Sequence, residues 1–145
     1  KDVDTPIFLS VLNGSFMFTA DLVRKMGIQP DVVFIKLASY EGTESTGKVK
    51  QIMGLTSSVK GKTVVIVEDI VETGNTIEEM YNILKEEGAA DIKVCTLLFK
   101  PQAYKKDIAI DYAALQIPND FIVGYGLDYN QLGRQYKDIY VLDEE

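Results

Sequence analysis

The chain of 145 residues contains no histidine. This absence excludes serine–histidine triads and histidine general bases, and it removes the commonest ligand of zinc sites. Acid–base chemistry in this protein therefore has to come from aspartate, glutamate, lysine or tyrosine.

Cysteine is nearly absent as well: Cys95 stands alone, so no disulfide bond can form within the chain. Cys95 lies in the apolar run IKVCTLLF, and we expect an inert, buried thiol in a protein of a reducing compartment. No apolar run approaches the ~18 residues of a membrane span, and the first residues, KDVDTP, carry no signal-peptide pattern. We expect a cytoplasmic protein that does not bind membranes.

Basic residues are outnumbered, with 15 Lys and Arg against 22 Asp and Glu and a net charge of −7. This balance repels phosphates overall and argues against a nucleic-acid partner, while a local basic pocket for a small anion stays open. The hydrophobic content of 46% is enough for one globular core, and we expect a single domain over residues 1–145.

Apolar runs typical of strands alternate with stretches of helical periodicity. Helical spacing of apolar side chains begins at Phe16 and stops at Gly27, and it begins again at Ile77 and stops at Gly88. The runs expected as strands are residues 7–12, 32–37, 63–67 and 94–99, with a last strand at 139–142. This order predicts an α/β protein with a mainly parallel sheet covered by helices.

Two segments break the alternation. Residues 38–61 are rich in Ser, Thr, Gly and Lys, with one apolar stretch around Ile52 and Met53 that we interpret as a strand rather than a helical turn. Residues 100–120 are polar with scattered aromatic side chains, and the pattern indicates no regular element there.

Three carboxylates crowd the stretch VVIVEDIVETGNT, where Glu68 and Asp69 end a strand and Glu72 precedes a helix. Ligands of open α/β sheets bind beyond the carboxyl ends of the strands, which is where these acids lie. The hydroxyls, the glycine and the free N–H groups of the following TGNT suit a phosphate. A helix cap alone would explain TIEE but not Glu68 and Asp69. The stretch predicts a sugar-phosphate site, with hydroxyls or a magnesium ion on the acids.

Two glycine-rich stretches resemble nucleotide-binding motifs but lack a required residue. GTESTGKV, residues 42–49, follows the P-loop pattern except that Val49 replaces the hydroxyl that binds magnesium. GYGLDY, residues 124–129, has Tyr129 where a dinucleotide fingerprint needs its third glycine. We assign a nucleotide to neither stretch.

VVIVEDIVETGNT resembles the phosphoribosyl pyrophosphate signature of the type I phosphoribosyltransferases. LSVLNGSFMFTADL resembles the family's pyrophosphate loop and following helix, and LASYEGTESTGKVK resembles its mobile active-site loop. LLFKP and IPNDFIVGYGLDYNQLGRQY resemble the purine-binding segments of the hypoxanthine-guanine members, so the likeness runs from about residue 8 to residue 142. It implies the type I phosphoribosyltransferase fold, a central, mainly parallel, twisted sheet flanked by helices with a small purine-binding hood.

The resemblance implies the residues that bind the phosphoribosyl group. Glu68 and Asp69 would bind the ribose hydroxyls or a magnesium ion, and Asp128 would support that ion. The residues that would hold the 5-phosphate are Thr73, Gly74, Asn75 and Thr76.

It also implies how pyrophosphate is held and water excluded. Asn13 and Gly14 would bind pyrophosphate through backbone N–H groups, and Arg134 would contact it. Ser39 and Tyr40 would close over the reacting atoms.

On the base side, Lys100 would donate to O6 of the purine, Phe121 would stack on its ring, and backbone groups of Ile122 would read its edge. Transfer also requires a carboxylate to take the N7 proton as N9 attacks, and Glu72 stands where this family normally has aspartate. Its extra methylene could shift the carboxylate by about an ångström, a displacement that can cost ~100-fold in rate. We expect activity to survive with Glu72 as the base.

The function that the resemblance implies is magnesium-dependent transfer of phosphoribosyl to hypoxanthine or guanine, giving IMP or GMP and pyrophosphate. One alternative is a regulatory module that senses the ligand without catalysis, and another is a transferase for adenine or a pyrimidine. Lys100 favours a 6-oxo base, because a cationic donor complements O6. The resemblance further implies a homodimer or homotetramer, and a chain that lacks the family's N-terminal segment, which helps to build the hood.

Overall fold

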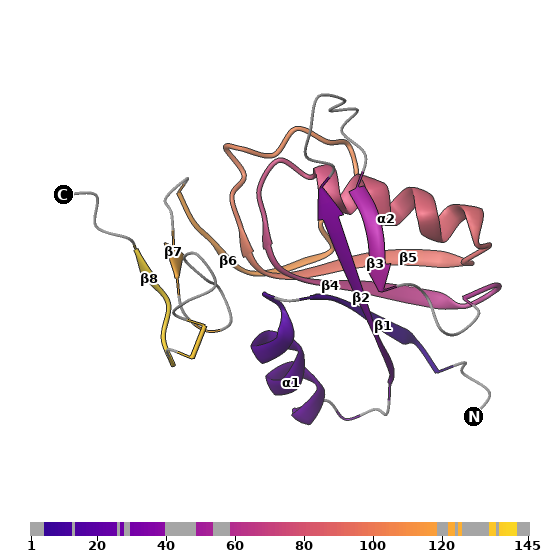
Figure 1. Ribbon diagram of the computed structural model, residues 1–145, viewed down its shortest axis with the longest axis horizontal. Helices are drawn as coiled ribbons and strands as arrows, with labels where there is room; N and C mark the ends of the chain where they lie inside the picture. Colours follow the sequence, from indigo (N-terminus) through magenta and orange to yellow (C-terminus); the bar gives the residue numbers. More distant parts are fainter. Residues whose placement is uncertain are drawn as a thin grey trace.

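The computed structural model describes residues 5–12, 14–25, 27, 30–39, 49–53, 59–118, 122–123, 125, 134–135 and 137–141. These residues form a six-stranded sheet with one helix on each face, and a separate two-stranded ribbon (Figure 1). The helices are α1 (Phe16–Arg24) and α2 (Asn75–Glu86), and neither combines the length and the apolar composition needed to cross a membrane.

The sheet is mainly parallel, as the sequence predicts. Its strands lie in the order β3 (Val49–Met53), β2 (Asp31–Ser39), β1 (Ile7–Leu12), β4 (Thr63–Val71), β5 (Asp91–Phe99) and β6 (Tyr112–Gln116). The five strands from β2 to β6 run parallel, and only β3 pairs antiparallel, with β2. The apolar stretch around Ile52 and Met53 is therefore a strand, as interpreted.

Each face of the sheet has its own apolar core, because successive side chains of a strand point to opposite faces. In β1, Phe8 packs against Phe18 of α1 on one face. Ile7 and Leu9 belong to the larger cluster on the other face, where α2 contributes Ile77, Met80 and Leu84. The two helices are thus amphipathic covers of a sheet that is buried on both sides at its centre.

Two elements differ from the sequence-based expectation. β4 continues to Val71 rather than stopping at residue 67, because Ile70 and Val71 still pair with β5, so Glu68 and Asp69 lie inside the strand. β6 falls within the segment where no element was expected. It is an edge strand with exposed Tyr112 and Leu115, and its sequence, YAALQ, has neither β-branched residues nor the apolar–polar alternation that identifies a strand.

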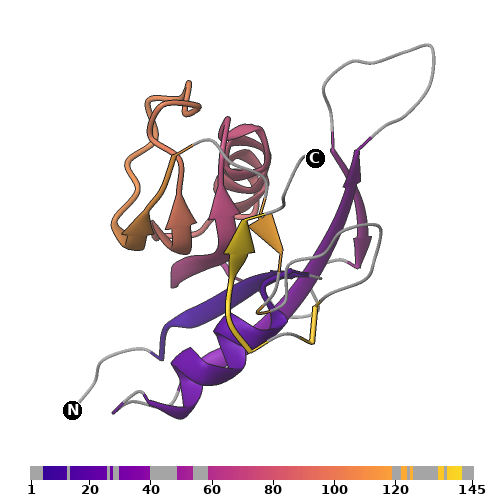
Figure 2. The same ribbon diagram turned by 90° about the vertical axis from the view of Figure 1, so that its left-hand side faces the viewer.

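The course of the chain creates one crevice at the carboxyl ends of the strands. β1 leads through α1 to β2 on one side, whereas β4 leads through α2 to β5 on the other, so the strand order reverses between β1 and β4. Such a reversal is where ligands bind in open α/β sheets. The ribbon of β7 (Ile122–Val123) and β8 (Tyr140–Val141) lies beyond these carboxyl ends (Figures 1 and 2), and β8 confirms the expected last strand.

Candidate active site

A cavity of about 310 Å³ lies where the strand order reverses. Its walls come from Val11, Leu12 and Gly14 at the end of β1 and from residues 68–77 at the end of β4 and the start of α2. Two loops that are far apart in the sequence therefore face one another across the cavity. The predicted residues that the structure brings together around it are Gly14, Glu68, Asp69, Glu72, Thr73, Gly74, Asn75 and Thr76.

The loop before α2 has the geometry of an anion site. Gly74 precedes the helix with φ +92°, and the Thr73 hydroxyl accepts from the backbone N–H of Asn75 at 3.4 Å. A Cβ atom at Gly74 would lie 2.6 Å from carbons of both Tyr104 and Lys106. Only glycine fits this backbone without displacing its neighbours, and the positive end of α2 suits a phosphate.

Burial raises the pKa of both acids of β4. Glu68 is 5% exposed, and its pKa is raised well above the usual range by burial, then by the negative charge of Asp69 and a hydrogen bond to it. Burial also raises the pKa of Asp69 to about 6, although backbone N–H groups, Glu68 and the charge of Arg134 act in the opposite direction. Arg134 thus lies close enough for its charge to act on Asp69. Burial therefore disfavours the charged forms of both carboxylates.

Magnesium suits this donor set. Mg²⁺ prefers carboxylate oxygens and is usually held by one or two of them together with substrate phosphates. Glu68 and Asp69 supply two such groups, and a divalent cation would stabilise their charged forms. Within the described ranges, no cluster gathers three or more candidate ligands, and Asp128 lies outside those ranges.

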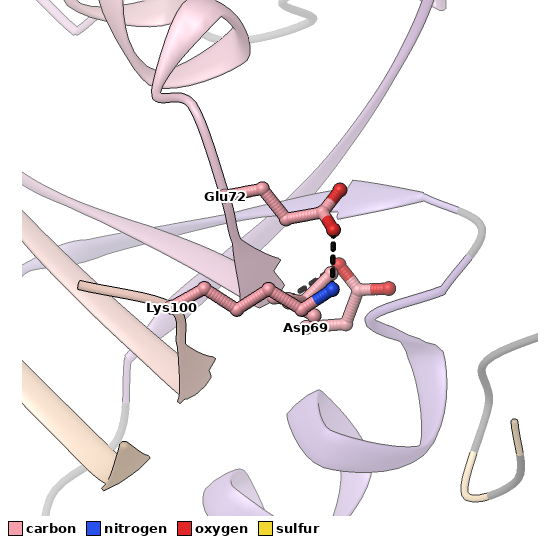
Figure 3. A network of polar contacts seen from close by, with 4 residues as sticks. Asp69, Glu72 and Lys100 are labelled. Carbon is pink, nitrogen blue, oxygen red and sulfur yellow. Dashed lines mark hydrogen bonds and ion pairs between the residues drawn. The ribbon is translucent and has the colours of Figure 1, made fainter. Parts of the chain in front are cut away.

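Lys100 and Glu72 form an ion pair with 2.6 Å between Nζ and Oε2 (Figure 3). The Lys100 side chain is 4% exposed and that of Glu72 51% exposed, so the pair reaches from the protein interior to the solvent side of the cavity. The backbone N–H of Lys100 donates to the carbonyl of Val71, which fixes the start of this segment beside the end of β4. The structure thus brings a cationic donor and a carboxylate side by side. The sequence alone did not indicate this contact.

The segment after Lys100 lies against the phosphate loop, which the sequence did not indicate. The Tyr104 ring makes an edge contact with Phe99, and the backbone N–H of Lys105 donates to the carbonyl of Thr73. Lys106 pairs with Glu78 in the first turn of α2 at 3.0 Å. Tyr104 and Lys106 therefore support the loop, and no periodicity or motif would have identified them.

Several predicted residues cannot be placed in this way. Asn13, Tyr40, Phe121 and Asp128 lie outside the described residues. For Ser39 and Ile122 only the backbone is described, at the carboxyl end of β2 and in β7. Cys95 is buried in β5, and burial raises the pKa of its thiol to about 11, so it matches the expectation of an inert cysteine.

Comparison with known proteins agrees with this arrangement. The phosphoribosyl transferase domain model matches residues 2–130. A hypoxanthine-guanine phosphoribosyltransferase of Streptococcus pneumoniae is 40% identical over 97% of this chain and 78% of the relative. The structure also resembles a hypoxanthine phosphoribosyltransferase of Staphylococcus aureus, with a TM-score of 0.88 and 37% identity over 96% of this chain and 77% of that one. It resembles the Trypanosoma cruzi enzyme in complex with the product IMP, with a TM-score of 0.89 and 39% identity over 98% of this chain and 77% of that one.

Proposed function

This chain belongs to the phosphoribosyltransferase family and, within it, to the hypoxanthine-guanine phosphoribosyltransferases, and we propose that it transfers phosphoribosyl from phosphoribosyl pyrophosphate to N9 of hypoxanthine or guanine. The chain is a transferase of purine salvage. The products of the proposed reaction are IMP or GMP and pyrophosphate.

The ion pair between Lys100 and Glu72 carries the choice of base. A 6-oxopurine presents O6 and N7 on one edge. Lys100 is a donor for O6, whereas it would face an amino group in adenine. Glu72 is an acceptor for the N7 proton, which the base loses as N9 attacks the sugar. A base that lies against the pair leaves the buried Lys100 and the half-exposed Glu72 both hydrogen-bonded.

The loop of residues 73–76 is proposed to hold the 5-phosphate, because it lines the cavity at the positive end of α2. Glu68 and Asp69 would bind the ribose hydroxyls or magnesium. Gly14, with Asn13, would donate backbone N–H groups to pyrophosphate, which has to lie on the β1 side of the cavity.

Cleavage of the sugar–pyrophosphate bond builds positive charge on the anomeric carbon and negative charge on the leaving group. Arg134 would contact the leaving pyrophosphate, and its charge already reaches the cavity. Magnesium, held by Glu68, Asp69 and Asp128, would supply further positive charge when bound. The segment with Ser39 and Tyr40 would exclude water, which otherwise competes with the purine for the sugar.

The remaining proposals concern the setting of the enzyme. The family resemblance supports a homodimer or homotetramer. The acidic composition supports small-molecule substrates rather than nucleic acid. The single buried thiol supports a cytoplasmic location, since secreted domains commonly rely on disulfide bonds.

The test is nucleotide formation by the purified protein with phosphoribosyl pyrophosphate and magnesium, offering hypoxanthine, guanine, xanthine and adenine separately. We expect turnover with 6-oxopurines and none with adenine. Adenine as the best substrate would refute the role of Lys100. Binding of phosphoribosyl pyrophosphate without turnover of any base would favour the alternative of a ligand sensor.

A further inference from the structure

Three buried hydroxyl groups connect β1 to α1 on either side of the loop that contains Gly14. Ser10 and Ser15 are 0% exposed and Thr19 is 2% exposed. The Ser10 hydroxyl lies 2.8 Å from that of Ser15 and 2.7 Å from that of Thr19. The Ser15 hydroxyl donates to the carbonyl of Val11.

The number of protons available fixes the direction of these hydrogen bonds. A hydroxyl group has one proton to donate. Because Ser15 donates to Val11, it has to accept from Ser10, and Ser10 in turn has to accept from Thr19. The hydroxyls therefore form a line between β1 and α1, which runs from Thr19 of α1 through Ser10 and Ser15 to the Val11 carbonyl near the end of β1.

Two features show that the hydroxyls do more than fill space. Ser15 occupies the N-cap position of α1, yet its side chain does not cap the helix. The same face of the sheet is apolar nearby, with Phe8, Phe18 and Val67 in one cluster. Apolar residues of similar size would satisfy packing there, since replacing both partners of a buried hydrogen bond can be nearly neutral for stability.

The end of β1 is supported by one neighbouring strand, because β2 pairs with β1 up to Leu12 whereas β4 stops pairing with it earlier. The ladder between β1 and β4 ends at Ser10 and Val67, and the two strands separate beyond that point to open the cavity. Gly14 then approaches Asp69 so closely that a Cβ atom at Gly14 would lie 1.9 Å from Asp69 Oδ2. Any shift of the loop would therefore move its N–H groups and disturb the Asp69 carboxylate.

We propose that Ser10, Ser15 and Thr19 are positioning residues that hold the Gly14 loop in place to bind pyrophosphate. This inference rests on the proposed function, which assigns pyrophosphate to that loop. The three hydroxyls should therefore affect the binding of pyrophosphate and not that of the base. Lys100 and Glu72, which are proposed to bind the base, follow β5 and β4 rather than β1.

The test measures the Kd of inorganic pyrophosphate with Mg²⁺, and the KM of phosphoribosyl pyrophosphate and of hypoxanthine, on the full chain. The double variant Ser10→Ala/Thr19→Val removes both partners of the hydrogen bond between Ser10 and Thr19. We expect its melting temperature to lie near that of wild type. We expect the pyrophosphate Kd and the KM of phosphoribosyl pyrophosphate to rise roughly tenfold, with the KM of hypoxanthine within about twofold.

Two matched substitutions separate hydroxyl chemistry from packing. Thr19→Ser keeps the hydroxyl and loses a methyl group, so it should retain wild-type pyrophosphate affinity, whereas the isosteric Thr19→Val should weaken it even if the double variant does not fold. Thr96→Val is the control, because the buried Thr96 hydroxyl donates to the carbonyl of Leu98 at 2.9 Å, within β5 rather than between β1 and α1.

If Thr19→Val and the double variant both fold and both bind pyrophosphate as tightly as wild type, the inference is wrong. The proposed function would not be affected by that result. An equal rise in the KM of hypoxanthine would overturn it too, because general damage to the site would then explain the effect. Wild-type protein that binds neither pyrophosphate nor phosphoribosyl pyrophosphate would overturn the proposed function and this inference together.

Discussion

Lys100 Nζ lies 2.6 Å from Glu72 Oε2, although the two residues are 28 positions apart in the chain. The contact forms because β4 and β5 are neighbours and both residues directly follow a strand end. It unites the two side chains that the proposed reaction requires at the O6 and N7 edge of the purine, and it makes the contribution of each testable.

Glu72→Gln should lower kcat by about 10²- to 10⁴-fold, the range for loss of a general base. The KM of phosphoribosyl pyrophosphate should change little, because the amide keeps the shape of the side chain. Steady-state kinetics with hypoxanthine would measure both values. Glu87→Gln, at the exposed end of α2, is the matched control, and turnover near wild type in Glu72→Gln would show that Glu72 is not the base.

Lys100→Met should raise the KM of hypoxanthine and guanine by roughly 10- to 100-fold, as expected when a hydrogen bond from a charged group is lost. The fold should persist, because a flexible apolar side chain replaces a buried cation whose partner, Glu72, is solvent-accessible. Pyrophosphate affinity, measured by calorimetry, should be retained. Lys93→Ala, a surface lysine of β5, is the control, and an unchanged KM for the bases in Lys100→Met would exclude contact with O6.

Gly74→Ala should destabilise the protein by about 1–3 kcal/mol, because alanine is strained at positive φ and the new Cβ would collide with Tyr104. The same shift should weaken phosphate binding in the loop. Denaturant unfolding and the Kd of phosphoribosyl pyrophosphate would measure the two effects. At Gly27 a Cβ atom would meet nothing within 4 Å, so Gly27→Ala is the matched control. Equal stability of the two variants would contradict this account of the loop.

Cys95 should make the protein less stable at alkaline pH. Burial raises its folded-state pKa from 9.0 to about 11. The unfolded chain therefore loses the thiol proton at lower pH than the folded one, and the contribution of Cys95 to stability is full below pH 9 and declines as pH rises towards 11. Comparing urea unfolding of wild type and Cys95→Ala across this range isolates the effect. A pH-independent difference between the two proteins would contradict the burial-raised pKa.

Thiol reactivity gives a separate expectation. Native Cys95 should react slowly with iodoacetamide at pH 8, since the thiolate is the nucleophile and little of it forms in the core. The same protein in concentrated urea should react at the rate of a free cysteine. Equal rates in the two states would show that the thiol is accessible in the fold.

The order of the main elements could be predicted from the residues alone, because apolar periodicity follows directly from which side chains must be buried. Runs such as that of Ile7–Leu12 and the helical face with Ile77 and Leu84 predicted β1 and α2 correctly. The stretch with Glu68, Asp69 and Gly74 could also be identified. Three neighbouring acids before a helix do not stabilise a fold, but they can bind a ligand or a metal ion.

The contacts between distant segments could not be predicted from the residues and depend on the three-dimensional fold. β6 could not be recognised because YAALQ has neither β-branched residues nor apolar–polar alternation, and its pairing with β5 fixes it as an edge strand. The contact of Gly14 with Asp69, the support of Gly74 by Tyr104 and the hydroxyl chain through Ser10 join segments that are distant in the chain or on opposite sides of a loop. Strand order creates such contacts, and local sequence does not encode strand order.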